Sequence, residues 1–471
     1  MSRFFYDRLS FLDRSFLLAE APTSHMHVGG VATLEAGPLL KPDGGIDIDR
    51  IREYVSSRLH LIPRYRERLA FTPVEGAPVW VDDPHFNIHY HVRHASLPRP
   101  GDARQLKRLC GRIVSQQLDR SKPLWEMWIV EGLEGADRFA MVTKIHHCMV
   151  DGVSSVDLLE VLLSPEPVEK IERAPRFVPR PAPTPLELAF AETVRRVRAP
   201  VDAALDVRRV LRDAEDPRSD LRTMLRAVRG TLSSSLRVVS DTPINKPIGP
   251  HRRIDWCKMD LGRVKEVRKR LGGSLNDVVL AIVAGAMRRY LESREVSVEG
   301  LEFRVMTPVS VRSANERGTL GNRVSAWMVD LPLAERDPKA CLERIRDTTL
   351  RLKEEKHALG AEVLTTVAGW TPATLLSLGS RMVTRALPFN LVVTNVPGPQ
   401  VPLYLLGSRM HDNYGQLPLI NYLGLGIVLF SYAGQLCWGF TADWDLLPDL
   451  HDVVIATEEA FEEICGAAGL E

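Results

Sequence analysis

The sequence predicts an α/β fold, an α+β sandwich of two domains joined by a helical, proline-rich connection. Strand and helix patterns alternate up to about residue 164, and a new series of buried patterns begins near Ile254. Between them, seven prolines occur from residue 165 to residue 185, where they disfavour regular structure. The chain has 471 residues and is 45% hydrophobic, enough for two or three domains. We therefore expect domains over 1–164 and 254–471, with a connection over 165–253.

The most informative stretch of the first domain runs from His146 to Gly152. The preceding run, 139–145, is rich in apolar and β-branched residues and predicts a strand. The following run, 153–163, has the apolar spacing of an amphipathic helix. The two histidines therefore lie at a strand end, a rigid position from which an imidazole can point into a cleft. A further helix is predicted over 102–121.

Proton abstraction is the chemistry that suits this stretch. A neutral histidine, with an ordinary pKa near ~6.5, can take the proton of an alcohol, which then attacks an acyl carbonyl. Asp151 is close enough to orient a ring, and Gly152 permits backbone angles that other residues resist. The alternative is that His146 and His147 are polar loop residues. The complete pattern between a strand and a helix favours the catalytic interpretation.

A metal site and a cysteine nucleophile compete with this interpretation. Neighbouring residues at a strand end face opposite sides, so His146 and His147 cannot easily share one ion. No third ligand has a convincing spacing, and we predict no metal. The same divergence leaves Cys148 without a base directed at its sulfur. One histidine is expected to face the cleft and the other to pack inward.

The clearest element of the second domain is a helix from Asn276 to about Glu292. Ser274 is placed to cap it, and Asp277 provides an acidic residue in its first turn. Asn276 has two interpretations that stay open here. Its amide can donate to a developing oxyanion, or it can merely help to cap the helix.

Two further segments of the second domain need interpretation. A strand over 391–394 is followed by Asn395, Pro397 and Gly398, which predict a rigid turn that either walls an acyl channel or is an ordinary loop. The stretch from Asn413 to Ala442 has no charged residue and is long enough to span a bilayer. Its internal glycines favour a buried hairpin of two strands instead.

The connection is basic as well as proline-rich, with 18 Lys or Arg residues against 12 Asp or Glu residues over 165–253. Its stretch 186–230 is predicted to be helical, and Leu186, Leu188 and Phe190 would suit a helix lying on an anionic membrane or lipid-droplet surface. The alternative, which the interspersed acidic residues favour, is a solvated link between domains.

Composition excludes several classes of function. The net charge is +1 and no basic block is interleaved with aromatic residues, so we expect no nucleic-acid partner. The six cysteines are scattered without a Cys-x-x-Cys pair, as in a reducing compartment. No long apolar segment follows the first charges, so we expect no signal peptide and a cytoplasmic location.

The motif from His146 to Gly152, His-His-x-x-x-Asp-Gly, resembles the signature of the coenzyme A-dependent acyltransferase superfamily, which includes chloramphenicol acetyltransferase and condensation domains. Within it, the chain is similar to the bacterial wax ester synthase/diacylglycerol acyltransferase family, and the resemblance spans essentially the whole chain. The other blocks that carry it are Leu9–Asp13 with Phe16–Leu17, His25–Gly30, Pro123–Trp128, Ser274–Asp277 and Thr394–Pro399.

The resemblance implies two chloramphenicol-acetyltransferase-like domains with an active-site tunnel between them. It makes His147 the general base, His146 its support, Asp151 the partner of an unidentified arginine, and Asn276 a candidate for the site. A fatty acyl group would pass directly from acyl-CoA, a co-substrate rather than a cofactor, to a long-chain alcohol or diacylglycerol. The product would be wax ester or triacylglycerol, formed in the cytoplasm or peripherally on the inner membrane or lipid droplets.

Other functions remain as alternatives. A condensation-type or other acyltransferase of the superfamily would use a different hydroxyl or amine acceptor. A non-catalytic lipid-surface protein would not need His147 at all. The preferred acceptor, the acyl-chain length and the oligomeric state do not follow from the sequence.

Overall fold

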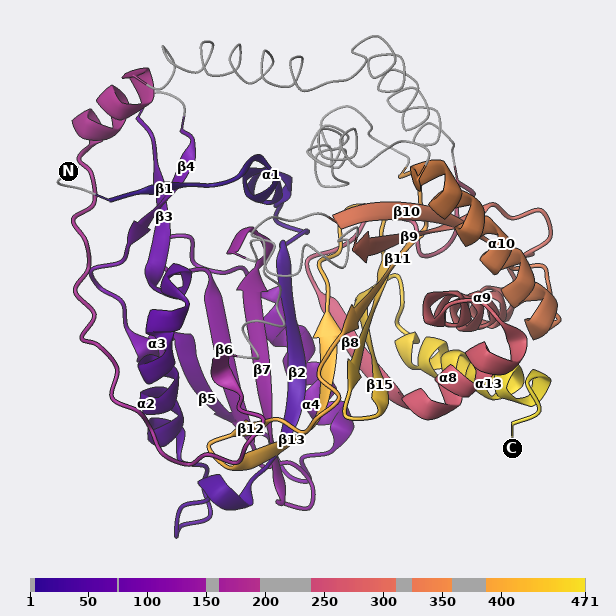
Figure 1. Ribbon diagram of the computed structural model, residues 1–471, viewed down its shortest axis with the longest axis horizontal. Helices are drawn as coiled ribbons and strands as arrows, with labels where there is room; N and C mark the ends of the chain where they lie inside the picture. Colours follow the sequence, from indigo (N-terminus) through magenta and orange to yellow (C-terminus); the bar gives the residue numbers. More distant parts are fainter. Residues whose placement is uncertain are drawn as a thin grey trace.

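The computed structural model describes residues 5–73, 76–149, 161–194, 239–310, 324–357 and 387–470. Two six-stranded sheets form the centres of two lobes, and a small three-stranded sheet lies at one end of the first lobe (Figure 1). The fold is therefore the mixed α/β sandwich that the sequence predicts.

The first sheet is mixed, with the order β12-β13-β2-β7-β6-β5. One face packs against helix α2 and the other against helix α4, and both interfaces are apolar. The bounds are Tyr404–Leu405 for β12, Ser408–Gln416 for β13, His27–Glu35 for β2, Arg138–His146 for β7, Trp125–Glu131 for β6, Val92–Ser96 for β5, Ile48–Arg58 for α2, Ile88–His91 for α3 and Ala103–Ser115 for α4.

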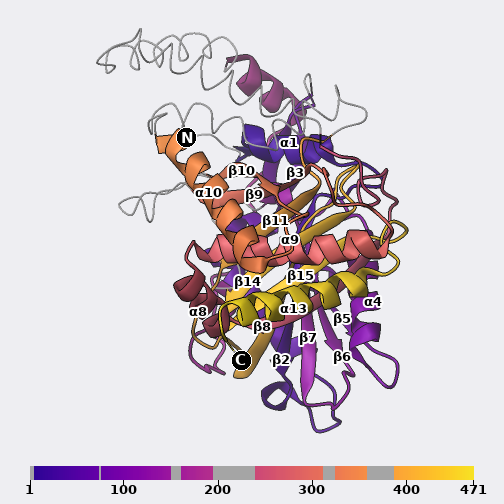
Figure 2. The same cartoon turned by 90° about the vertical axis from the view of Figure 1, so that its right-hand side faces the viewer.

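The second sheet has the order β10-β9-β11-β14-β15-β8. The helices α9 and α13 run side by side over its outer face and bury the largest core of the molecule (Figure 2). The bounds are Val324–Leu331 for β10, Phe303–Ser310 for β9, Leu391–Pro397 for β11, Leu425–Tyr432 for β14, Gln435–Asp443 for β15, Arg252–Asp260 for β8, Leu261–Leu271 for α8, Leu275–Ser293 for α9, Pro338–His357 for α10 and Leu450–Ala467 for α13.

The first described part of the connection, residues 165–194, runs along the outside of the first lobe (Figure 1). Residues 165–184 contain no helix or strand, and arginine contacts hold them: the Arg66 guanidinium lies 4.7 Å from the ring centroid of Phe177, and Arg180 donates to Asp82 at 2.6 Å. A helix follows over 185–194. The small sheet beneath it consists of β1 (Asp7–Arg8), β4 (Pro78–Asp82) and β3 (Glu67–Phe71).

Strand β13 crosses from the second half of the chain into the first sheet. It pairs antiparallel with β2, from Met410 opposite Leu34 to Gln416 opposite Gly29. The sequence places residues 404–416 in the C-terminal range, yet here they complete the N-terminal sheet. The two halves of the chain are thus joined by main-chain hydrogen bonds within the first sheet.

Several predicted elements are confirmed. Strand β7 covers 139–145, helix α9 begins and ends within a residue of its prediction, and the uncharged stretch up to Ala442 contains the antiparallel hairpin β14–β15. Among the described residues no single helix is long and apolar enough to cross a membrane. Helices α8 and α9 meet that test only as a pair bent by 99°, and most of α9 is buried in the core.

Other predicted elements are corrected or lie outside the described residues. The helix predicted over 102–121 ends at Ser115, because Gln116 turns extended and Asp119 starts a local turn with Ser121. Asn395 and Pro397 belong to strand β11 rather than to a turn after it. Most of the predicted helix 153–163 and the stretch 195–230 lie outside the described residues.

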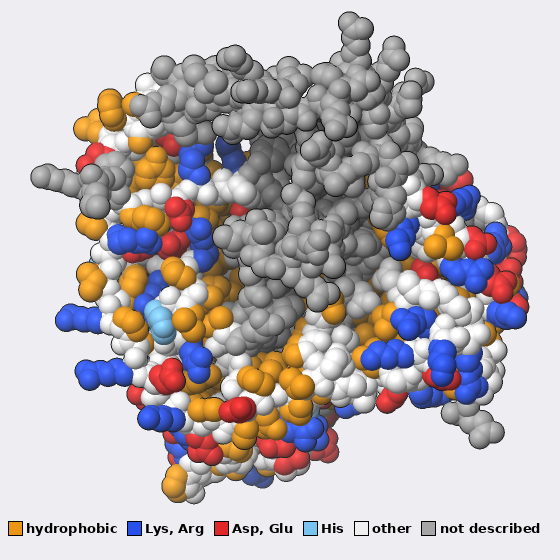
Figure 3. Space-filling model, viewed as in Figure 1, with side chains coloured by type: hydrophobic (Ala, Val, Ile, Leu, Met, Phe, Trp, Pro, Cys, Tyr) orange, Lys and Arg blue, Asp and Glu red, His pale blue; other side chains and the backbone are white. Residues whose placement is uncertain are grey.

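Charged side chains of both signs lie interspersed on the described parts of the face in Figure 3. This mixture agrees with the net charge of +1. On the described part of this face, no large patch of a single sign is visible.

Candidate active site

The histidine pair is positioned by main-chain hydrogen bonds at the end of β7. The His146 N–H donates to the carbonyl of Leu124 at 2.9 Å, and the His147 N–H donates to the carbonyl of Met26 at 2.7 Å. The chain then turns through a short 3-10 helix, His147–Met149. The backbone of the pair is therefore held from both neighbouring segments, as a strand-end site requires.

The His147 ring is stacked on Phe16 of helix α1 (Phe11–Ala19), with 3.8 Å between the centroids and 21° between the planes. The residue is half-buried, while its Nδ1 is fully enclosed and makes no hydrogen bond within the described residues. Burial lowers the pKa of the His147 ring to about 4, and it outweighs the backbone carbonyl of His147 itself, which raises the pKa. At neutral pH the ring is therefore uncharged and able to accept a proton.

The His146 ring has different neighbours, as the alternation of side chains predicts. It is 1% exposed, and its Nδ1 accepts the Cys148 N–H at 3.1 Å. The Nε2 atom of His146 lies 3.7 Å from Glu20 Oε2, beyond hydrogen-bond distance, and makes no hydrogen bond within the described residues. His146 thus closes the turn that follows His147 and lies beside a carboxylate.

Glu20, which sequence analysis did not identify, is the anion of this site. It follows α1 directly, its side chain is 2% exposed, and Arg120 Nε donates to its Oε2 at 3.0 Å. Burial alone would raise the pKa of Glu20, but His146 and Arg120 outweigh burial and hold the pKa at about 2. Arg120 also donates to the carbonyl of Leu17 at 3.2 Å, so it anchors the end of α1 as well.

Two further histidines extend the cluster, His25 just before β2 and His27 at its first residue. His27 lies directly across the sheet from His146 and is 2% exposed, and its ring is 5.4 Å from the ring of His25. Neither nitrogen of His27 makes a hydrogen bond within the described residues, and Nδ1 of His25 has none either. Burial is the main cause that lowers the pKa of both rings. The positions of His25 and His27 are visible in the sequence, but the pairing of His27 with His146 is not.

The residues predicted from the second domain occupy a separate place. Ser274 and Asp277 form the complete capping box of α9, and Asp277 also accepts from Thr349 at 2.8 Å. Asn276 is half-buried in the first turn of α9 and does not take part in that box. Among the residues that the structure describes, no hydrogen bond or ion pair joins these residues to the histidine cluster, so the role of Asn276 remains a prediction.

The channel candidates lie at the end of β11. Gly398 has no room for a side chain, since an added Cβ would come within 2.4 Å of Phe430 and 2.5 Å of the Ser431 carbonyl. Asn395 and Pro397 pair with β14. A tight contact between neighbouring strands is therefore the established role of Gly398, and a role for the three residues in a channel stays a prediction.

Asp151 and Gly152 lie outside the described residues, and so does any arginine bound to Asp151. Within the described ranges, no group of three His, Cys, Asp or Glu side chains could hold a metal ion. Cys148 is 1% exposed, and burial raises its pKa well above the usual range of a thiol. A thiol in that state is a poor nucleophile.

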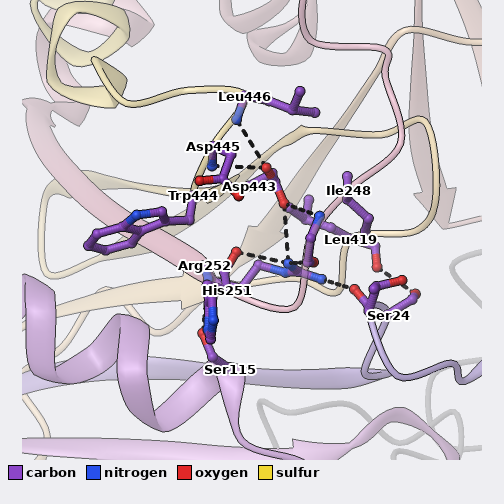
Figure 4. A network of polar contacts seen from close by, with 12 residues as sticks. Ser24, Ser115, Ile248, His251, Arg252, Leu419, Asp443, Trp444, Asp445 and Leu446 are labelled. Carbon is purple, nitrogen blue, oxygen red and sulfur yellow. Dashed lines mark hydrogen bonds and ion pairs between the residues drawn. The ribbon is translucent and has the colours of Figure 1, made fainter.

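A second polar network joins the lobes beside this cluster (Figure 4). Arg252, at the start of β8, is 5% exposed and donates to the carbonyls of Gly249 at 2.7 Å and His251 at 2.9 Å. The same guanidinium reaches the carbonyl of Thr23, two residues before His25, and pairs with Asp443 at 3.6 Å. The loop that carries the histidines is therefore tied to the second lobe.

The two mixed sheets and the crossover strand β13 give the molecule an architecture that is also found in solved structures. The starter condensation domain of rhizomide synthetase, solved with C8-CoA and Leu-SNAC, matches 98% of this chain and 94% of its own with a TM-score of 0.59. At 12% identity this likeness establishes the fold alone. The chain thus has the architecture that condensation domains share.

The family follows from the sequence comparisons. Residues 9–279 match the wax ester synthase/diacylglycerol acyltransferase catalytic domain, and residues 320–465 match the WS/DGAT C-terminal domain. A putative diacylglycerol O-acyltransferase of Mycobacterium tuberculosis is 34% identical over 97% of this chain and 90% of its own length. The wax ester synthase/diacylglycerol acyltransferase structure from Marinobacter aquaeolei VT8 is 25% identical, with a TM-score of 0.74 over 98% of this chain and 100% of that one. The chain belongs to the wax ester synthase/diacylglycerol acyltransferase family, and it is an acyltransferase.

Proposed function

We propose that the chain transfers a fatty acyl group from acyl-CoA directly to the hydroxyl of diacylglycerol or of a long-chain alcohol, with His147 as the general base. The observation that carries the proposal is the neutral, half-buried His147 ring, held against Phe16 at a strand end. Diacylglycerol is the first candidate acceptor because the curated relatives are named diacylglycerol O-acyltransferases.

The reaction balances without a covalent enzyme intermediate. His147 takes the hydroxyl proton, the alcohol oxygen bonds to the thioester carbon, and the carbon–sulfur bond breaks. The proton then passes from His147 to the departing thiolate, so no net proton leaves the site. His146 acts as a positioning residue, because its Nδ1 accepts the Cys148 N–H in the turn that carries His147, and the Glu20 carboxylate lies beside the His146 ring.

A small apolar recess lies beside the strand that leads to His147. Its volume is about 10 Å³, room for about one water, and Ile145, two residues before His147, lines it. The recess is too small to hold a fatty chain, so the choice of a fatty acyl group rests on the names of the relatives. The other lining residues include Val55, Leu59, Ile62, Tyr65, Trp125, Met127 and Leu162.

The proposed location of the protein is the surface of a membrane or lipid droplet. Leu186 and Phe190 lie one turn apart in the helix 185–194 and are 83% and 73% exposed, whereas Leu188 packs inward at 4%. Two exposed apolar residues on one helix face suit contact with a membrane or droplet. Flotation with anionic vesicles should weaken in Leu186→Ser/Phe190→Ser, and unchanged flotation would refute this part alone.

The decisive assay for the chemistry compares His147→Ala with the unchanged chain, using palmitoyl-CoA with diacylglycerol, hexadecanol or a short alcohol and measuring thiol release and ester product. We expect a loss of about a hundredfold or more in kcat, the usual contribution of a general base. His411→Ala is the matched control, because His411 is also partly buried with a lowered pKa but faces Glu35. Undiminished ester formation in His147→Ala would exclude the assigned role.

A further inference from the structure

Gln416 carries a buried side-chain amide at the end of strand β13. The residue is 5% exposed, and neither its Nε2 nor its Oε1 makes a hydrogen bond within the described residues. An amide enclosed without partners loses its hydrogen bonds to water and gains none in return, so such a group in a native fold needs an explanation. One explanation is a partner that arrives with the substrate.

The register places Gln416 on the sheet face that carries the histidines. Gln416, the last residue of β13, lies directly opposite Gly29 of β2. His27 is two residues from Gly29 on the same strand, so Gln416 and His27 are diagonal neighbours on one face. Diagonal neighbours are about 7–8 Å apart, within reach of a long side chain.

The same face is turned toward the second lobe. Tyr414, two residues before Gln416, stacks on Trp256 of β8 with 5.2 Å between the ring centroids. Gly439 of β15 touches the Gly415 backbone so closely that an added Cβ would lie 2.0 Å from the Gly415 oxygen. Gln416 is thus enclosed at the seam of the two lobes. Another buried hydroxyl without a hydrogen bond, that of Thr441, lies on the same strand as Gly439.

We infer that Gln416 binds a secondary amide of the acyl-CoA arm. A glutamine amide whose donor and acceptor are both unmatched is complementary to a group that offers an acceptor and a donor side by side, as a secondary amide does. Acyl-CoA carries such amides, the nearest of them two carbons from the sulfur. A fatty alcohol and a diacylglycerol carry none. This inference rests on the proposed function, since it concerns the donor substrate of the same reaction.

The spacing agrees with that assignment. One diagonal step from Gln416 to His27, one cross-strand step to His146 and one residue to His147 add up to roughly 15–17 Å along the backbone path. Two extended side chains and the two-carbon link between sulfur and amide can cover this distance. Gln416 would therefore bind the arm while the thioester carbon lies near His147.

The test compares kcat/KM for two thioester substrates in the unchanged chain and in a Gln416 variant. S-decanoyl N-acetylcysteamine carries the amide nearest the sulfur, and S-decanoyl 2-mercaptoethyl acetate replaces its N–H by oxygen. With hexadecanol as acceptor, the unchanged chain should prefer the amide thioester by at least ~10-fold in kcat/KM, because the ester analogue leaves a buried acceptor unpaired. Gln416→Met should reduce that preference to about twofold or less.

Ser408→Ala is the matched control. Ser408 lies at the other end of β13, is 0% exposed and also has an unpaired side-chain oxygen, so its removal should leave the preference unchanged. Gln416→Asn, which keeps the amide but withdraws it by one carbon, should give an intermediate preference and provides a second variant. Equal rates with both thioesters in the unchanged chain, or the full preference retained in Gln416→Met, would overturn the inference. Either result would leave the role of His147 intact, whereas only a failure of His147→Ala to reduce activity would remove that role.

Discussion

Replacing Glu20 by glutamine removes the charge at the centre of the histidine cluster while keeping its shape. The pKa of Glu20 is held at about 2, against 4.5 for an unperturbed glutamate, and this difference corresponds to about 3 kcal/mol of stability at neutral pH. Solvent screens little of this contribution, because the side chain is 2% exposed. We expect Glu20→Gln to lower the free energy of unfolding by about that amount near pH 7.

The pH dependence identifies the cause of the loss. Because folding lowers the pKa of Glu20, its contribution is complete above pH 4.5 and disappears as the pH falls toward about 2. Urea unfolding should therefore show a difference between the two proteins that is about 1–1.5 kcal/mol smaller near pH ~3.5 than at pH 7. A difference that does not change with pH would refute the assignment of an ionised Glu20.

Glu67→Gln is the matched control for this experiment. Glu67 is also buried against arginine, at 4% exposure with Arg64 Nη1 at 2.6 Å, but burial raises its pKa. A raised carboxyl pKa means that ionisation at neutral pH costs stability, so this substitution should cost less at pH 7 than at acid pH. The two variants are expected to show opposite trends.

Two further substitutions test how the lobes are joined. Arg252→Met should lower the free energy of unfolding in urea by about 3–5 kcal/mol, because it leaves Asp443 buried without its cation. Adding Asp443→Asn to this variant should recover part of the lost stability. If the two substitutions instead destabilise the protein additively, the two groups do not interact. Gly439→Ala should destabilise the fold by about 3 kcal/mol, because the new Cβ would lie 2.0 Å from the Gly415 oxygen. Gly466→Ala is the control and should stabilise the fold by up to about 1 kcal/mol. Gly466 lies on an exposed part of α13, and an added Cβ there would have no atom within 4 Å. Equal melting temperatures for these two glycine variants would contradict the close packing of β13 on β15.

The parts of the fold that could be predicted are those encoded locally. The strand before His146, the capping box of Ser274 and Asp277, and the β14–β15 hairpin each depend on residues a few positions apart. Periodicity and capping report such elements directly. Proline and glycine mark turns less reliably, because Pro397 can end a strand where its missing N–H is not needed.

The rest of the site depends on contacts that no local pattern contains. Glu20 and Arg120 are separated by 100 residues, and each looks like an ordinary surface charge in the sequence. His27 meets His146 only because β2 pairs with β7 in one particular register. Gln416 lies on the same face because strand β13 crosses into the first sheet. Dividing the sequence into consecutive domains does not predict such a crossover.

The crossover also constrains how the protein can be made. Strand β2, which carries His27, emerges early from the ribosome, but its partner β13 lies at Ser408–Gln416. Until that distant segment is synthesised, β2 has an unpaired edge able to associate with other chains. Contacts of such long sequence separation also slow folding. Newly made chains should therefore depend on chaperones until translation is nearly finished, and the catalytic cluster should be among the last features to form.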